Sequence, residues 1–224
     1  MKCRIQIEIS KKRKKIAIKL LESDQLYLSF PPFYTMQRAQ EWIAQNQDWI
    51  DKASTHLMKK HNQHTFPQNK ILFLGQWIEC VVDHSLKHQY TFTHQKLILQ
   101  EPEALKLFYR QEAQHYLPIK VEEISSVMGV KPHRVTIRTQ KSRWGSCSSR
   151  GTISLSDHLM KMPQNVGDYI IIHELAHLKH LHHQASFWEF VALYAPDFRD
   201  AIRWLKKHQS MMTVDFSKTL STVT

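Results

Sequence analysis

Apolar and polar residues alternate near the start of the chain, over residues 5–9 and again over 16–20. A period of two is typical of half-buried strands, so the first thirty residues are predicted to form a β-hairpin meander. Between the two runs lies the strongly basic segment "SKKRKK" at residues 10–15. We expect a solvated hairpin tip here, and a phosphate-binding finger is the alternative, because flanking strands would project the charges together.

The pattern then changes to helical spacing over residues 36–60, where Trp42 and Trp49 are a heptad apart and are predicted to anchor a core. Short strand-like runs follow at 71–74, 77–82 and 96–99, with Gly75 marking a tight turn. The first hundred residues are therefore predicted to be a mainly β N-terminal region with one helix.

Helical patterns dominate after Pro102. A long helix is predicted over 103–128, and Pro118 is expected to kink or divide it. Two strands and three helices should follow, at 133–139, 151–156, 163–181, 185–194 and 197–208, with a loop or bulged hairpin at 140–150. The pattern predicts an α+β fold with a second domain over residues 101–212 and a frayed tail over 213–224.

Composition narrows the class of protein. The 31 Lys and Arg against 20 Asp and Glu give a net charge of +11 over 224 residues. This charge favours the binding of polyanions in general but does not identify a particular partner. No apolar run approaches the ~20 residues of a membrane span, so no membrane partner is expected. The three cysteines are an odd number and far apart, and the N-terminus lacks an apolar leader. Both observations favour a reducing cytoplasm.

The segment "IIHELAHLKHLHH" at residues 171–183 carries the clearest chemistry. His173 and His177 are four residues apart, so they share one helix face and can reach the same ion, while Glu174 lies near that face. Apolar neighbours predict that the helix is buried, where unpaired polar groups would be costly. The pattern therefore predicts a Zn²⁺ site with Glu174 as the base that takes a proton from a metal-activated water.

A catalytic zinc site needs a third protein ligand. His180 shares the helical face, but a straight helix would spread residues 173–180 over ~10 Å of axis, too far for one ion. A histidine beyond the helix end can fold back onto the metal. Spacing favours His183 over His182 only mildly, so both remain candidates at this point.

Three sequence blocks together resemble a known family. They are "RWGSCSSRGTISLS" at 143–156, "DYIIIHELAHLKH" at 168–180, and a histidine four residues before "FW" at 187–188. Their order and spacing are similar to the YgjP-like metal-dependent hydrolases, relatives of the SprT-like and WLM-type zinc metallopeptidases. The resemblance implies a zincin-like catalytic domain with His173, His177 and His183 as ligands and Glu174 as base. The family usually has Asn-His-Ser around the third ligand, where this chain has His182-His183-Gln184.

The segment "RWGSC" has two interpretations of equal weight. In one, Arg143, Trp144 and Gly145 belong to an active-site strand that binds substrate as an added β-strand. In the other, the segment closes the wall of the cleft by packing through Trp144. Cys147 is predicted to be a structural thiol.

Three residues are candidates to stabilise an oxyanion, and the sequence does not choose among them: Arg138, His158 and Tyr194.

These features predict a cytoplasmic zinc-dependent hydrolase of the metallopeptidase type, acting on peptides or proteins. One alternative keeps the metal site but hydrolyses a phosphoanhydride such as a nucleoside triphosphate, although no glycine-rich phosphate loop is present. Another is a basic nucleic-acid-binding protein with a structural metal. The sequence leaves the oligomeric state open.

Overall fold

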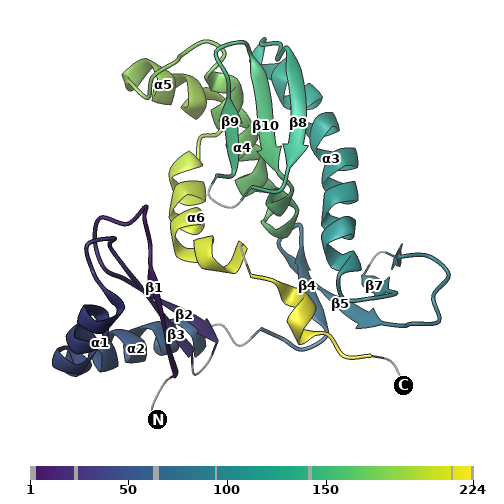
Figure 1. Cartoon of the computed structure of the whole chain (residues 1–224). Coiled ribbons are helices and arrows are strands. Elements are labelled where there is room, and N and C mark those ends of the chain that lie inside the picture. Colours follow the sequence, from purple (N-terminus) through teal and green to yellow (C-terminus); the bar gives the residue numbers. More distant parts are fainter. Residues whose placement is uncertain are drawn as a thin grey trace. The chain divides into compact units, whose positions relative to one another are not determined.

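The computed structural model describes residues 4–22, 25–62, 66–93, 95–140, 143–212 and 214–222. The chain forms two compact units, Met1–Thr65 and Phe66–Thr224, and the fold is α+β as predicted (Figure 1). Among the helices described, none combines the length and apolarity that crossing a membrane requires.

The smaller unit pairs a three-stranded sheet with two helices. Its elements are β1 (Arg4–Ile9), β2 (Ala17–Glu22), β3 (Gln25–Phe30), α1 (Met36–Gln45) and α2 (Gln47–Asn62). The strand order is β1-β3-β2, with β1 parallel and β2 antiparallel to β3. The predicted meander was therefore wrong in its pairing, because β3 separates the first two strands.

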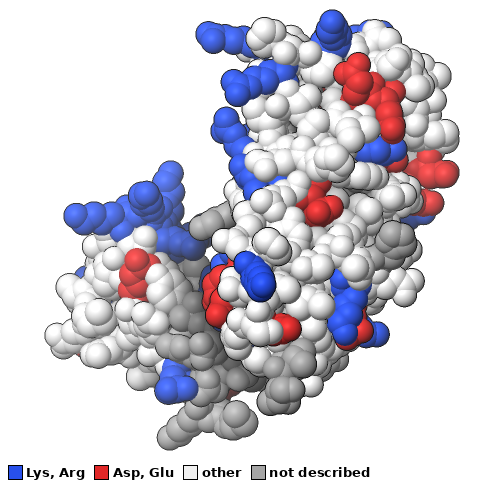
Figure 2. Space-filling model, turned by 90° about the vertical axis from the view of Figure 1, so that its right-hand side faces the viewer, with Lys and Arg blue, Asp and Glu red and all other residues white. Residues whose placement is uncertain are grey.

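The basic segment connects these two outer strands and is not the tip of a hairpin. Residues 11–15 are all exposed, and Lys and Arg side chains gather on the smaller unit in Figure 2. The exposure of residues 11–15 fits the expectation that this segment is solvated. Phosphate binding by the segment stays a prediction.

The helix predicted over 36–60 is two helices, because Asn46 ends the first. Its side-chain Nδ2 and its backbone N–H both donate to the carbonyl of Trp42, at 2.8 and 3.0 Å. Trp42 packs edge-on against Phe30, with ring centroids 5.6 Å apart. Trp49 contacts Trp42 but is 46% exposed, so the prediction of a core anchor was wrong for Trp49.

Two sheets form the framework of the larger unit. The first consists of β4 (Lys70–Phe73), β5 (Gln76–Val82), β6 (Tyr90–Thr93) and β7 (Lys96–Leu99), in the order β4-β5-β7-β6. The second consists of β8 (Arg134–Arg138), β9 (Gly145–Cys147) and β10 (Thr152–Ser156), in the order β8-β10-β9. Because β9 pairs antiparallel with β10 alone among the described strands, it is an edge strand.

Helices complete this unit. They are α3 (Ala104–Met128), α4 (Gln164–Ala176), α5 (Ala185–Tyr194) and α6 (Phe198–Met212), with 3₁₀ turns η1 (Asp157–Lys161) and η2 (Phe216–Thr219). Pro118 lies inside α3 without dividing it. In Figure 1, α3 and α4 lie side by side against the second sheet, with α3 next to β8 and α4 next to β9 and β10. The first sheet also packs into this core, through Ile71 and Leu97. The unit therefore begins at residue 66, well before the predicted boundary at residue 100.

Gly75 sets how closely the first sheet approaches α4. Its φ of +81° lies in the left-handed region, which favours glycine. A Cβ at this position would lie 2.7 Å from the Cα of Pro163. The tight turn predicted here is confirmed, and the turn abuts the residue that precedes α4.

The tail is docked, and the prediction that it frays was wrong for the described residues 214–222. Phe216 is fully buried and packs edge-on against Phe66 and Trp77. The backbone N–H groups of Asn69 and Val82 donate to carbonyls of the tail. The sequence pattern could not show this, because the partners of Phe216 lie more than a hundred residues earlier in the chain.

Candidate metal centre

Helix α4 and its C-cap carry the first two histidines of the candidate centre. It is buried along most of its length, so His173 is held within the core with only part of its ring accessible. The Nε2 atom of His173 lies 3.1 Å from Nε2 of His183. Its Nδ1 atom is buried and has no hydrogen-bond partner in the described part of the chain.

His177 caps the C-terminus of α4, so the helix ends sooner than the predicted limit of Leu181. The Nδ1 atom of His177 is 3.0 Å from the carbonyl oxygen of His180. Since a carbonyl only accepts, Nδ1 must carry the proton, and Nε2 keeps its lone pair for a ligand. His180 therefore acts through its backbone and orients His177.

His183 reaches the same point from the turn before α5. Its ring centroid is 5.0 Å from that of His173 and 4.7 Å from that of His177. One ring nitrogen from each of His173, His177 and His183 lies within 4.8 Å of the others. His182 is exposed and lies outside this group. The structure thus brings together the three histidines predicted as ligands.

The chemistry of these side chains fits a divalent metal such as zinc. Burial, reinforced by the neighbouring His177 and His183, lowers the pKa of His173 to about 4. Burial also lowers the pKa of His177. Both rings are therefore neutral near pH 7, which is the form that binds metals. Three converging imidazole nitrogens are a common donor set for catalytic zinc.

Glu174 lies beside this group and is almost fully buried, at 8% exposure. Burial raises the pKa of its carboxyl to about 7, and two neighbours oppose the shift. The backbone N–H of Cys147 donates a hydrogen bond to the carboxylate, and the positive charge of Arg143 is near. Edge strand β9 therefore holds the carboxylate in place.

Gly145 allows β9 to come this close. A Cβ atom there would lie 2.8 Å from Cγ and 2.9 Å from Oε1 of Glu174. Real Cβ atoms almost never approach other atoms so closely. Any larger residue at position 145 would therefore displace the carboxylate or the strand.

Comparisons with known proteins show the family of this chain. A sequence model described as the YgjP-like metallopeptidase domain matches residues 14–208. The chain belongs to the YgjP-like family. Membership makes it a metal-dependent, peptidase-like hydrolase and confirms the family resemblance seen in the sequence.

One solved structure similar to this YgjP-like chain is the metallopeptidase zymogen of Pyrococcus abyssi abylysin. It is 31% identical, with 41% of this chain and 94% of abylysin covered and a TM-score of 0.35. A search of curated proteins gave no match.

Sequence reasoning missed the aromatic residues that support the histidines of this YgjP-like centre. The ring of Phe187 is fully buried and lies 4.7–5.0 Å from all three imidazoles. Trp188 packs against His173 and His183 and stacks on Phe198. The "FW" pair follows the third histidine closely, and this spacing was the available signal.

The predicted residues of the "RWGSC" segment differ in their surroundings. Arg143 is exposed on the approach to Glu174, whereas Trp144 is half-buried and packs against the core. Burial and the nearby Glu174 raise the pKa of the Cys147 thiol. This shift fits the predicted structural thiol, because it disfavours the nucleophilic thiolate.

The candidate oxyanion residues do not gather at the histidines. Arg138 ends β8 and is exposed, and Tyr194 packs on Phe190. His158 lines a different cavity together with Lys161 and Asp215. The structure therefore supports none of the three as an oxyanion-stabilising residue.

Proposed function

We propose that this chain is a zinc-dependent metallopeptidase in which His173, His177 and His183 hold the metal and Glu174 is the general base. The observation that carries the proposal is the convergence of ring nitrogens from three histidines beside a buried carboxylate. When bound, zinc supplies Lewis-acid polarisation of the scissile carbonyl and lowers the pKa of a water molecule.

Glu174 is placed to move the proton. Its carboxylate is fixed by the backbone N–H of Cys147, so one oxygen is anchored and the other is able to take a proton from water. The same carboxyl can then give the proton to the departing amine, which allows the peptide bond to break. The fully buried ring of Phe187 packs against the three imidazoles beside it.

Strand β9 offers a place for the substrate backbone. The backbone groups of Trp144 and Ser148 bond to β10, and partners alternate along a strand. The peptide groups of Gly145 therefore face the outer edge, on the side of Glu174. This arrangement supports the binding of an extended peptide as an added strand, with Arg143 close to the reacting centre.

A direct assay separates this proposal from its alternatives. Zinc-loaded protein should cleave casein or fluorogenic peptides, lose that activity on dialysis against a chelator, and regain it when zinc is returned. Phosphate release from nucleoside triphosphates is measured in parallel. Two results would contradict the proposal. In one, the zinc-loaded protein cleaves no peptide but releases phosphate from a nucleoside triphosphate. In the other, it cleaves no peptide and only binds nucleic acid in a salt-sensitive way.

Gly145→Ala should lower kcat by at least about tenfold, because the new methyl group displaces the Glu174 carboxylate, and a small misplacement of a catalytic group has large effects on rate. Zinc content should be unchanged, since no histidine moves. Steady-state kinetics and metal analysis on the same preparation measure both.

Gly167→Ala is the matched control. Gly167 lies in α4, and nothing lies within 4 Å of a Cβ added there. Activity should be retained, and the helix should gain slight stability. Equal kinetics for the two variants would show that the close approach of β9 to Glu174 has no catalytic role.

A further inference from the structure

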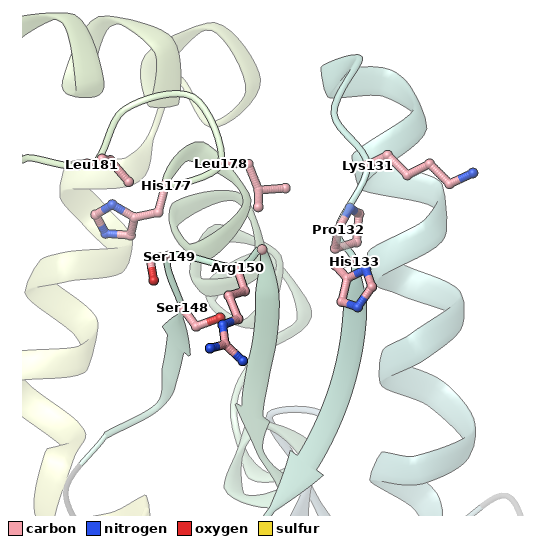
Figure 3. Close-up of a pocket in the computed structure, with 10 residues that line it drawn as sticks. Lys131, Pro132, His133, Ser148, Ser149, Arg150, His177, Leu178 and Leu181 are labelled. Atoms are coloured by element: carbon pink, nitrogen blue, oxygen red, sulfur yellow. The ribbon is translucent and has the colours of Figure 1, made fainter.

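A second feature adjoins the candidate metal centre. An open cavity of about 450 Å³ has His177 in its wall (Figure 3). Its other polar lining groups are two hydroxyls and three basic side chains, from Ser148, Ser149, Lys131, His133 and Arg150. Among the described residues that line it, none is Asp or Glu. The cavity is therefore suited to a negatively charged group.

The turn between β9 and β10 builds this cavity. The backbone N–H of Gly151 donates to the carbonyl of Ser148 at 2.9 Å, and φ of Gly151 is +75°. The hydroxyl of Ser148 accepts from the backbone N–H of Thr152 at 3.1 Å. The backbone N–H of His133 ties the turn to the start of β8, through the carbonyl of Gly151 at 2.9 Å. The cavity is thus held by the same strand that reaches Glu174.

Arg150 is the main candidate for binding an anion there. Figure 3 shows its guanidinium beside Ser148, while the side chain of Lys131 extends away from these groups. In the described part of the chain, no ion pair involves Arg150. Its planar fork matches the two oxygens of a carboxylate.

We propose that this cavity is a specificity subsite for a Glu or Asp side chain of the peptide substrate, with Arg150 as the pairing residue. The inference rests on the proposed peptidase function and deepens it. A peptide bound along β9 advances about 3.3 Å per residue, so it continues directly to the turn at Ser148. Leu178 and Leu181 also line the cavity, and they offer apolar contact to the methylene groups of a glutamate.

The first test uses cleavage. Fluorogenic peptides that differ only by Glu, Gln or Lys at positions flanking the scissile bond are compared by kcat/KM. The wild-type protein should prefer Glu over Lys by about tenfold or more at one position. Arg150→Glu should reverse this order. Arg203→Glu is the matched control, since Arg203 is exposed on α6 and pairs with Asp200, and it should keep the wild-type order.

The second test measures binding and does not depend on cleavage. The affinities of the same peptides are measured by fluorescence anisotropy on zinc-loaded Glu174→Gln protein, with and without Arg150→Glu. Preference for the Glu peptide, reversed by Arg150→Glu, supports the subsite even if the wild-type protein cleaves nothing, in which case only the peptidase proposal fails. The subsite proposal would be overturned if kcat/KM or affinity were the same for the Glu, Gln and Lys peptides. It would also be overturned if the protein bound none of them.

Discussion

Replacing His183 by Ala is expected to weaken zinc binding by more than about 100-fold, whereas His182→Ala should leave it unchanged. Losing a hydrogen-bonding partner of a ligand already costs about 10- to 100-fold in affinity, so loss of a direct ligand should cost more. The ring of His183 lies against those of both His173 and His177, while His182 lies outside the group of converging ring nitrogens. Competition with a chromogenic zinc chelator measures both affinities.

The two variants control each other, because they remove the same side chain from adjacent positions of one turn. If the two histidines acted only by stabilising this turn, His183→Ala and His182→Ala would change zinc affinity by a similar amount. Retention of zinc by His183→Ala together with its loss from His182→Ala would assign the third ligand to the alternative that the sequence left open.

Replacing Glu174 by Gln is expected to reduce kcat for peptide cleavage by about 10²- to 10⁴-fold, the usual contribution of a general base. Gln has nearly the same shape and keeps an oxygen that accepts from the Cys147 N–H, so the strand and the histidines should stay in place. Zinc content and the thermal unfolding temperature should therefore match those of the wild-type protein. Steady-state kinetics, metal analysis and thermal denaturation measure the three quantities.

Glu189→Gln is the control for this change, since Glu189 is exposed on the neighbouring helix α5. It removes the same charge from the helix that carries Phe187 and Trp188 and should keep full activity. A Glu174→Gln protein that retains zinc and cleaves peptides at near wild-type rate would reject Glu174 as the base.

The core of the candidate site could be predicted because it is local. His173 and Glu174 lie in one helix and His177 is its helical C-cap, so their spacing alone determines that they lie together. The third histidine lies beyond the end of that helix, and its position depends on where the helix stops. The structure ends α4 at Ala176 and places Phe187 against all three rings, and the spacing of the histidines alone could not determine either feature.

Features that depend on distant partners could not be predicted. An active-site strand was one of two interpretations of "RWGSC", but its pairing could not be predicted, because β9 has only three residues, begins with Gly145 and depends on β10. The parallel pairing of β1 with β3 and the docking of Phe216 also depend on contacts between segments that are far apart in sequence. The pattern of polar and apolar residues therefore gave most elements but not their pairing.

We propose that His173, His177 and His183 bind one metal ion beside Glu174. A crystal structure of the zinc-loaded protein, with anomalous diffraction recorded on both sides of the zinc absorption edge, tests it most directly. We predict a single strong anomalous peak among the ring nitrogens of the three histidines, adjacent to the Glu174 carboxylate. A peak at His182 or at another part of the protein, or no peak at these three rings, would contradict the account.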